Sequence, residues 1–323
     1  MAEPLVTVED LVFEYPSKRA LFGVGVTVPR GSITALVGPN GAGKTTLIRC
    51  LAGLHEPFSG RIKIGGIDVH DHPRQIHKRL GYLADFFGLY EDLSVARCLT
   101  YAAWVQGCAP EETDDLVRSA AERLDIADRL GEKAGALSRG LKQRLAIAQS
   151  IIHKPEFLIL DEPASGLDPD ARFRLSNLLV RLKDEGMTLL VSSHILSELE
   201  DYATGLIVIR DGRVVSQGLM RDVGGQTAND GERLALTLTE PDPRLENLLA
   251  GRDGVSAIHV ENRTARCRIT GGEAARHALL KSLLDAGLAV VDFRVEEDRL
   301  RDAYMATAEP IPEDPNTGGD ESS

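Results

Sequence analysis

The sequence has few cysteines and no long apolar run. Its four cysteines, Cys50, Cys98, Cys108 and Cys267, show no CxxC spacing, so we expect buried or unreactive thiols and no metal ligands or disulfides. No stretch of about 18–20 uncharged apolar residues occurs, so we expect no segment that spans a bilayer. The first twenty residues include early acidic side chains and no signal-peptide pattern, so we expect a cytosolic chain.

Basic residues are also in the minority. Lys and Arg number 37 against 49 Asp and Glu, which gives a formal net charge of −12 at pH 7. Sequence-independent binding to nucleic acid needs clustered cations, so we expect no nucleic-acid partner. Hydrophobic residues make up 43% of the chain and charged residues 27%, and a length of 323 residues favours two folded domains.

The pattern over residues 1–222 predicts an α/β domain. Alternating segments favour strands over LVTVEDLVFEY, LFGVGVTV and SITALVG, and residues of about 86–150 have the spacing of a helical lobe. The unalternating runs FLIL and TLLVSS are typical of parallel strands that are covered on both faces. The segment GLIVIRDGRVVSQG predicts an antiparallel hairpin at the sheet edge, with its turn at Asp211-Gly212.

A second, smaller domain is predicted after a linker. Residues 223–233 are rich in glycine and polar residues, which is typical of a linker. Residues 234–306 show the order β-α-β-β-α-β of a ferredoxin-like α+β domain, followed by a last helix at 297–306. Residues 309–323 contain five acidic residues, three prolines and no basic residue, so we expect an acidic disordered tail over 307–323.

Residues 38–46 read GPNGAGKTT, after a predicted strand and at the start of a predicted helix. This is the G-x-x-x-x-G-K-[ST] pattern of a phosphate-binding P-loop in its required context, where glycines let backbone N–H groups close around phosphate oxygens. We expect Lys44 to reach the β- and γ-phosphates, Thr45 to ligate Mg²⁺ and Thr46 to bind a phosphate oxygen. The predicted nucleotide-binding residues of this loop are Gly38, Pro39, Asn40, Gly41, Ala42, Gly43, Lys44, Thr45 and Thr46.

Two further segments supply carboxylates and a histidine. In FLILDE, Asp161 follows an apolar strand, where it can ligate Mg²⁺ beside a P-loop, and Glu162 can orient the attacking water. His194 follows TLLVSS at the carboxyl end of a strand, the edge where α/β sheets bind ligands. We therefore predict Lys44, Glu162 and His194 as catalytic residues.

The segment LSRGLKQR, residues 137–144, is a second candidate phosphate site. Ser138 is a suitable N-cap for a helix that we expect to reach His153. Free N–H groups and the helix dipole at such an end attract anions.

The P-loop, LSRGLKQR, FLILDE, SGLD (165–168) and SSHILSE (192–198) resemble, in this order, the motifs of an ABC-type ATPase. The resemblance covers roughly residues 4–220, and it implies ATP and Mg²⁺ as cofactors. It also implies a head-to-tail pair of ATPase domains, in a homodimer or in a heterodimer with a second ABC ATPase. The signature residues that would bind the partner's ATP are Ser138, Arg139, Gly140 and Gln143, with Arg139 in place of the usual glycine.

The resemblance suggests two further ligand contacts. Asp85 stands where most members carry a glutamine that contacts Mg²⁺ and water, and we predict a metal or water contact for it. Tyr15 best matches the aromatic residue that stacks on adenine, with Phe13 as an alternative. A packed strand aromatic without a ligand is the other interpretation of Tyr15.

Such an ATPase is expected to power a separate, integral membrane permease of the ABC-2 type. The stretch FFGLYEDLSV resembles the surface where a permease docks, and the C-terminal domain with its ending VEEDRLRDAYMA resembles ATPases of ABC-2-type exporters. We therefore expect an exporter subunit, cytoplasmic and peripheral on the inner face of the cell membrane through the permease. Two alternatives remain: a soluble ABC ATPase acting on a non-transport machine such as the ribosome, and a regulatory module that scarcely hydrolyses ATP.

Overall fold

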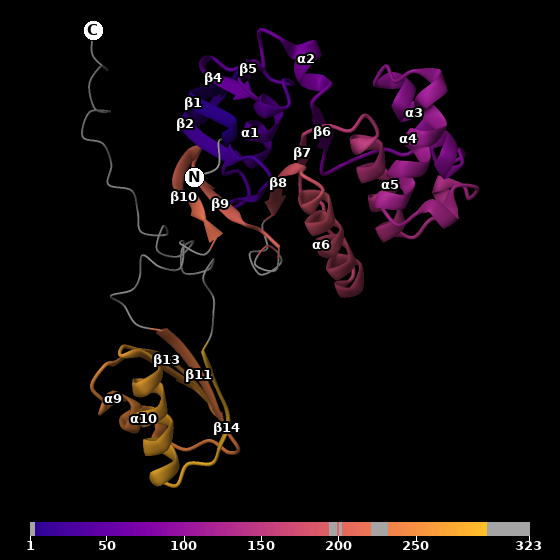
Figure 1. Cartoon of the computed structure of the whole chain (residues 1–323). Coiled ribbons are helices and arrows are strands. Elements are labelled where there is room, and N and C mark those ends of the chain that lie inside the picture. The colour runs from indigo at the N-terminus through magenta and orange to yellow at the C-terminus, as the bar shows by residue number, and fades with distance from the viewer. Residues whose placement is uncertain (1–3, 194–198, 200–201, 221–231, 296–323) are drawn as a thin grey trace, which may run out of the picture. The chain divides into compact units, whose positions relative to one another are not determined.

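A computed structural model describes residues 4–193, 199, 202–220 and 232–295 of the chain. The described residues form two compact units, the first within residues 4–220 and the second within residues 232–295. Figure 1 labels the elements of each unit. His194, the last helix predicted at 297–306 and the predicted tail lie outside the described residues.

The first unit contains two sheets. The antiparallel sheet has the strand order β2-β1-β4-β5, with β1 (Pro4–Tyr15), β2 (Lys18–Pro29), β4 (Ser59–Ile64) and β5 (Ile67–Asp68). The larger sheet has the order β10-β9-β3-β8-β7-β6, with β3 (Ile33–Val37), β6 (Leu80–Leu83), β7 (Phe157–Leu160), β8 (Thr188–Ser193), β9 (Gly205–Arg210) and β10 (Arg213–Leu219).

Parallel pairing joins the strands at the centre of the larger sheet. β3 pairs in parallel with β8 and β9, and β7 pairs in parallel with β8 and β6. Every residue of β3, β7 and β8 is buried, which confirms the interpretation of the unalternating runs. Because parallel strands run in one direction, the segments that follow β3, β6 and β7 come together at a single edge.

The predicted hairpin forms the antiparallel edge of this sheet. β9 pairs antiparallel with β10, and the turn residues Asp211 and Gly212 both have left-handed backbone conformations, with φ of 47° and 71°. The amide of Gly212 donates to the carbonyl of Ala42 at 2.9 Å, and its own carbonyl accepts from the amide of Phe22 at 2.9 Å. The hairpin turn is therefore hydrogen-bonded to both the P-loop and β2.

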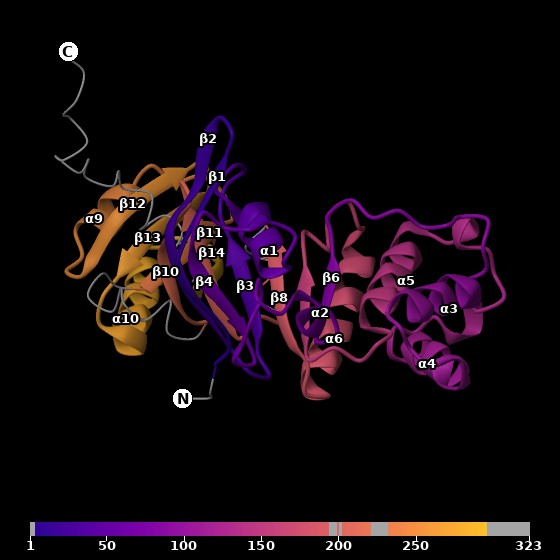
Figure 2. The same cartoon turned by 90° about the horizontal axis from the view of Figure 1, so that it is seen from above.

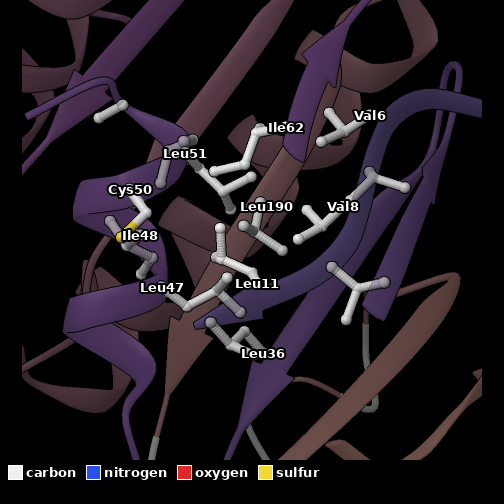
Figure 3. Packing of buried hydrophobic residues seen from close by; sticks show 14 of the residues in the cluster. Val6, Val8, Leu11, Leu36, Leu47, Ile48, Cys50, Leu51, Ile62 and Leu190 are labelled. Atoms are coloured by element: carbon white, nitrogen blue, oxygen red, sulfur yellow. The ribbon is translucent and has the colours of Figure 1, made fainter. Parts of the chain in front are cut away.

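The two sheets and helix α1 (Lys44–Leu51) share a hydrophobic core. Leu51 of α1, Leu11 of β1, Ile62 of β4 and Leu190 of β8 point toward one another there (Figure 3). The apolar face of α1 is thereby held against both sheets, which places the amino end of α1 beside the ends of the parallel strands.

The helical lobe consists of α3 (Val95–Val105), α4 (Pro110–Arg123) and α5 (Arg139–Ile151), which lie together in both views (Figures 1 and 2). Helix α6 (Pro169–Asp184) connects the segment after β7 to β8. The sequence did not predict β5 or the short helix α2 (Pro73–His77), because an element of two or five residues leaves too short a periodic pattern. No helix among the described residues combines the length and apolar character needed to cross a membrane.

The second unit has its own sheet and core. Its elements follow the order β-α-β-β-α-β, and the sheet order β12-β13-β11-β14 is antiparallel throughout. β11 begins at Glu232, inside the range predicted for the linker. The elements are β11 (Glu232–Leu238), α9 (Leu245–Ala250), β12 (Val255–Glu261), β13 (Thr264–Ile269), α10 (Gly272–Asp285) and β14 (Val290–Val295). The predicted fold class, an α/β domain with a helical lobe plus a small α+β domain, is confirmed.

Leu11→Ala is expected to lower the free energy of unfolding of the first unit by about 2–5 kcal/mol, because Leu11 is fully buried and its loss leaves a cavity. Chemical denaturation followed by circular dichroism measures this change. Leu54→Ala is the matched control, since Leu54 is 55% exposed and the same substitution there should cost under about 0.5 kcal/mol. Equal effects of the two substitutions would contradict the position of Leu11 in the core.

Candidate active site

A cavity of about 680 Å³ lies where the parallel strands end. The P-loop forms one wall, and the segments after β6 and β7 contribute Asp85 and Glu162. The lining residues from the predicted site are Tyr15, Pro39, Asn40, Gly41, Gly43, Lys44, Thr45, Thr46, Asp85 and Glu162. The fold thus brings together, in one cavity, predicted site residues that are up to 147 positions apart in the sequence (162 − 15, from Tyr15 to Glu162).

The P-loop has the backbone that its glycines predict. Gly41 and Gly43 have φ of 81° and 107°, a left-handed conformation that side chains with a Cβ rarely adopt. Gly38 and Ala42 are buried beneath the loop and are not among the described residues that line the cavity. A Cβ on Gly38 would overlap the carbonyl oxygen of Ile209, so the loop can lie this close to β9 only with glycine there.

Lys44 lies between the loop and the carboxylates. Its Nζ donates to the carbonyl of Gly38 at 2.7 Å and lies 3.9 Å from Oε1 of Glu162, and its side chain is only 7% exposed. Burial lowers the pKa of Lys44, while the negative charges of Glu162 and Asp161 act in the opposite direction. The ammonium group is therefore held in the cavity by fixed oxygen atoms.

Asp161 is a buried carboxylate with a defined set of partners. Only 2% of Asp161 is exposed, and Ser192 Oγ of β8 donates to its Oδ1 at 2.5 Å. The amide of Asp161 donates to the carbonyl of Leu83 on β6 at 2.9 Å. The same Ser192 Oγ accepts from the amide of Glu162 at 2.9 Å. Sequence reasoning missed Ser192, although a polar residue at the end of the apolar run TLLVSS was a usable signal.

Glu162 has a strained backbone. Its φ of 49° is in the left-handed region, which is uncommon for a residue with a long side chain and recurs at functional sites. Its amide is bonded to Ser192, and its carbonyl accepts from the amide of Ser165 at 3.1 Å. These contacts hold the turn after β7 so that the Glu162 carboxylate and Lys44 line the same cavity.

Oxygen donors of the type that Mg²⁺ prefers lie at this edge of the sheet. The carboxylates of Asp161 and Asp85 and the hydroxyl of Thr45 are hard oxygen donors, the type of ligand that Mg²⁺ prefers. Asp85 and Thr45 line the cavity, and Asp161 directly precedes the lining residue Glu162.

Tyr15 and its alternative Phe13 have different surroundings. Tyr15 is 38% exposed and lines the cavity, and its hydroxyl lies 3.3 Å from Oγ1 of Thr46. Phe13 is 8% exposed and stacks on His55, with ring centroids 5.0 Å apart. Tyr15 is therefore the better placed of the two for stacking on a base.

The cavity also contains residues that the sequence did not suggest. Except for Ser165, which lies in the turn after β7, they come from the β1–β2 hairpin and the β9–β10 turn, which reach the P-loop only in the folded sheets. The guanidinium of Arg19 lies over the ring of Phe22, 5.8 Å from its centroid. These residues are Lys18, Arg19, Ala20, Phe22, Ser165, Asp211 and Gly212.

The signature residues lie at the amino end of helix α5. Ser138 caps α5 as predicted, and its Oγ accepts from the amide of Leu141 at 3.4 Å. Gln143 is 7% exposed. Arg139 donates from Nη2 to the carbonyl of Ser165 at 2.9 Å. Within the described part of the chain, none of the four predicted signature residues lines the cavity of its own chain.

A P-loop before α1, a buried aspartate after β7 and an adjacent glutamate define a P-loop ATPase. A family model described as "ABC transporter" matches residues 21–165. Together with a relative that is 31% identical over 93% of this chain, this match shows that the chain belongs to the family of ABC transporter ATP-binding proteins.

Similarity to individual proteins extends beyond the matched segment. The chain is 31% identical over 302 residues to the uncharacterized ABC transporter ATP-binding protein YxlF of Bacillus subtilis, covering 93% of this chain and 98% of the relative. It is 36% identical over 276 residues to the Nod factor export ATP-binding protein I of Burkholderia thailandensis, covering 76% of this chain and 89% of that protein. A solved structure of an ATP-binding subunit of an ABC transporter has a TM-score of 0.62 and 33% identity, with 69% of this chain and 93% of that chain covered.

Ser192→Ala is expected to lower kcat for ATP hydrolysis by about 10–100-fold, because it removes the hydroxyl that orients the predicted metal ligand Asp161 and holds the amide of Glu162. Steady-state hydrolysis at several Mg²⁺ concentrations measures the effect, and we expect the Mg²⁺ requirement to rise. Ser176→Ala on α6 is the control, since that hydroxyl donates to the helix carbonyl of Arg172 at 3.1 Å, and Ser176 does not line the cavity. Unchanged kcat and Mg²⁺ dependence in Ser192→Ala would contradict this role.

Proposed function

We propose that this chain is the ATPase subunit of an exporter, in which it powers a separate membrane permease through ATP-driven closure of a dimer. The observation that carries the proposal is an exposed aromatic groove on the helical lobe, joined to the ATP cavity through consecutive residues. The export direction is supported by the similarity to a relative whose name includes Nod factor export.

In this proposal the cavity residues act on the phosphates of ATP. Lys44 binds the β- and γ-phosphate oxygens, and the P-loop amides hold the rest of the phosphate chain. Asp161, Thr45 and Asp85 hold Mg²⁺, which when bound neutralises charge on the transferring phosphoryl group. Glu162 orients the attacking water and accepts its proton, and Tyr15 stacks on the adenine. His194, which we predict to contact the γ-phosphate, lies outside the described residues.

The proposed dimer supplies what a single chain lacks. The amino end of α5, with Ser138 as its N-cap, offers amides and a positive dipole end for an anion. This end does not line the chain's own cavity. A head-to-tail pair would place the α5 end of each chain, with Ser138, Arg139, Gly140 and Gln143, on the ATP of the other.

The groove suits the short helix that we propose a permease inserts. It has a volume of about 370 Å³ and lies between the segment after β6 and helices α3 and α5. Phe86 is 93% exposed and Val105 65%, and the rings of Tyr90 and Tyr101 pack edge to face with centroids 5.3 Å apart. Apolar exposure of this extent is typical of protein–protein contact surfaces.

The groove and the ATP cavity are connected by the backbone. Asp85 lines the ATP cavity, and the next residue, Phe86, lines the groove. A displacement of Asp85 by the bound nucleotide and metal would therefore move the wall of the groove. This connection gives the proposed permease a mechanical link to the state of the nucleotide.

The test of the permease is copurification from gently solubilised membranes of the native host, using the tagged full chain. We expect one polytopic membrane protein in stoichiometric amount. Phe86→Ser should reduce its recovery at least tenfold while ATPase activity of the purified chain stays within about twofold, since Phe86 is 93% exposed, lines the groove and is not a lining residue of the ATP cavity.

Phe58→Ser is the matched control, because Phe58 is 73% exposed but is not part of the groove. Equal recovery with Phe86→Ser and the wild-type chain would contradict docking in the groove. Recovery of ribosomes without a membrane protein would replace the exporter proposal by that of a soluble ABC ATPase.

Glu162→Gln should trap a closed dimer with ATP, because the amide keeps the shape of the side chain but cannot accept the proton of water. Size-exclusion chromatography with light scattering, in Mg²⁺ and ATP, is expected to show the dimer, while the wild-type chain returns to a monomer as ATP is consumed. A Glu162→Gln chain that stays monomeric with bound ATP would count against the closure step.

A further inference from the structure

The signature residue Arg139 contacts the turn that carries Glu162 in its own chain. Arg139 is the first residue of α5, and its Nη2 donates to the carbonyl oxygen of Ser165 at 2.9 Å. Ser165 lines the ATP cavity, whereas Arg139 does not. Arg139 therefore contacts the cavity only indirectly, through the backbone carbonyl of a lining residue.

A glycine makes room for this contact. Gly166 has φ of 67°, and a Cβ on it would overlap the guanidinium carbon and both terminal nitrogens of Arg139. The planar guanidinium therefore lies directly against the backbone of residue 166. A residue with a side chain at this position would displace either Arg139 or the turn.

The turn is held at both ends by hydrogen bonds. At its start, the amide of Glu162 donates to Ser192 Oγ, and at its end the carbonyl of Ser165 accepts from Arg139. Between them, the amide of Ser165 donates to the carbonyl of Glu162 at 3.1 Å. The left-handed backbone of Glu162 needs such support from its surroundings, because that conformation is unfavourable by itself.

We propose that Arg139 is a positioning residue that holds the catalytic turn of its own chain, and with it Glu162, in the hydrolysing geometry. This role within one chain is separate from a contact of Arg139 with the partner's ATP. In the proposed dimer, on which only this last step rests, ATP bound against the α5 end of one chain would act through Arg139 on Glu162 of the same chain. The two ATP sites of a dimer would thereby be coupled.

The first test compares Arg139→Ala, Arg139→Lys and the control Lys142→Ala in the purified full chain. Lys142 is a cation on the same turn of α5, and it bonds to Glu91 instead of the catalytic turn. For Arg139→Ala we expect kcat to fall about tenfold and the Kd of ATP for the monomeric chain to stay within about twofold, because Arg139 does not line the nucleotide cavity of its own chain. Arg139→Lys should restore kcat only in part, because an ammonium lacks the planar shape that packs on Gly166.

Hydrogen exchange of the peptide covering residues 162–168 gives a readout that does not depend on hydrolysis. Arg139→Ala should speed the exchange of its amides at least threefold, while Lys142→Ala should leave it unchanged. Unaltered exchange and kcat in Arg139→Ala would overturn the proposal. A raised Kd with unaltered exchange would also overturn it, and would instead assign Arg139 to direct contact with nucleotide.

A double-mutant cycle with Gly166→Ala separates action within a chain from action across the dimer. In the wild-type chain Gly166→Ala introduces both backbone strain and overlap with Arg139, whereas in the Arg139→Ala chain only the strain remains. We expect the effects on kcat to be non-additive by about tenfold. Additive effects would show that Arg139 acts without this contact and would overturn the proposal.

These measurements need no permease, so they are distinct from the test of the exporter function. If the chain copurifies with a membrane protein but the two substitutions have additive effects, only the proposed role of Arg139 is wrong. If no membrane protein copurifies but the exchange and the coupling are as expected, only the proposed exporter function is wrong.

Discussion

The parallel pairing of β3, β8 and β7 is the constraint on which the site depends. The P-loop follows β3, Asp161 and Glu162 follow β7, and Ser192 is near the end of β8. Because these strands lie side by side and run in one direction, their carboxyl ends lie at the same edge of the sheet. Every residue of these three strands is buried, as expected of parallel strands covered on both faces.

The turn after β7 holds the two neighbouring acidic residues of the site, Asp161 and Glu162. Ser192 Oγ connects the buried carboxylate of Asp161 to the amide of Glu162, so one hydroxyl orients two neighbouring acidic residues. The unfavourable backbone of Glu162 is tolerated because neighbours from β8 and α5 hold both ends of the turn. Strain of this kind at an active site is consistent with a side chain kept in place before the substrate arrives.

The first unit presents two surfaces of different character. The ATP cavity is built from backbone amides, Lys44 and carboxylates, which suit phosphate and metal. The groove on the lobe is built from aromatic and aliphatic side chains, which suit an apolar partner. The peptide bond between Asp85 and Phe86 connects them. A movement of Asp85 when nucleotide and metal bind would therefore also move Phe86 in the groove.

The sequence alone determined most of what depends on local pattern. The P-loop, the buried strands, the N-cap Ser138 and the hairpin turn Asp211-Gly212 each follow from spacing, glycine position or capping chemistry within a few residues. The strands and helices predicted within the described residues are found, whereas the short elements α2 and β5 were not predicted, because their few residues carry too little periodicity.

Tertiary structure decided what depends on residues far apart in the chain. The sequence could not show that Ser192 bonds to Asp161, that Phe22 and Arg19 line the cavity, or that the β9–β10 turn is bonded to the P-loop. It suggested Arg139 as a cation for a partner's nucleotide, and the structure adds its bond to the carbonyl of Ser165, 26 positions away. These contacts arise from the order of strands in the sheet and from the packing of α5 against the turn, and no local pattern encodes either.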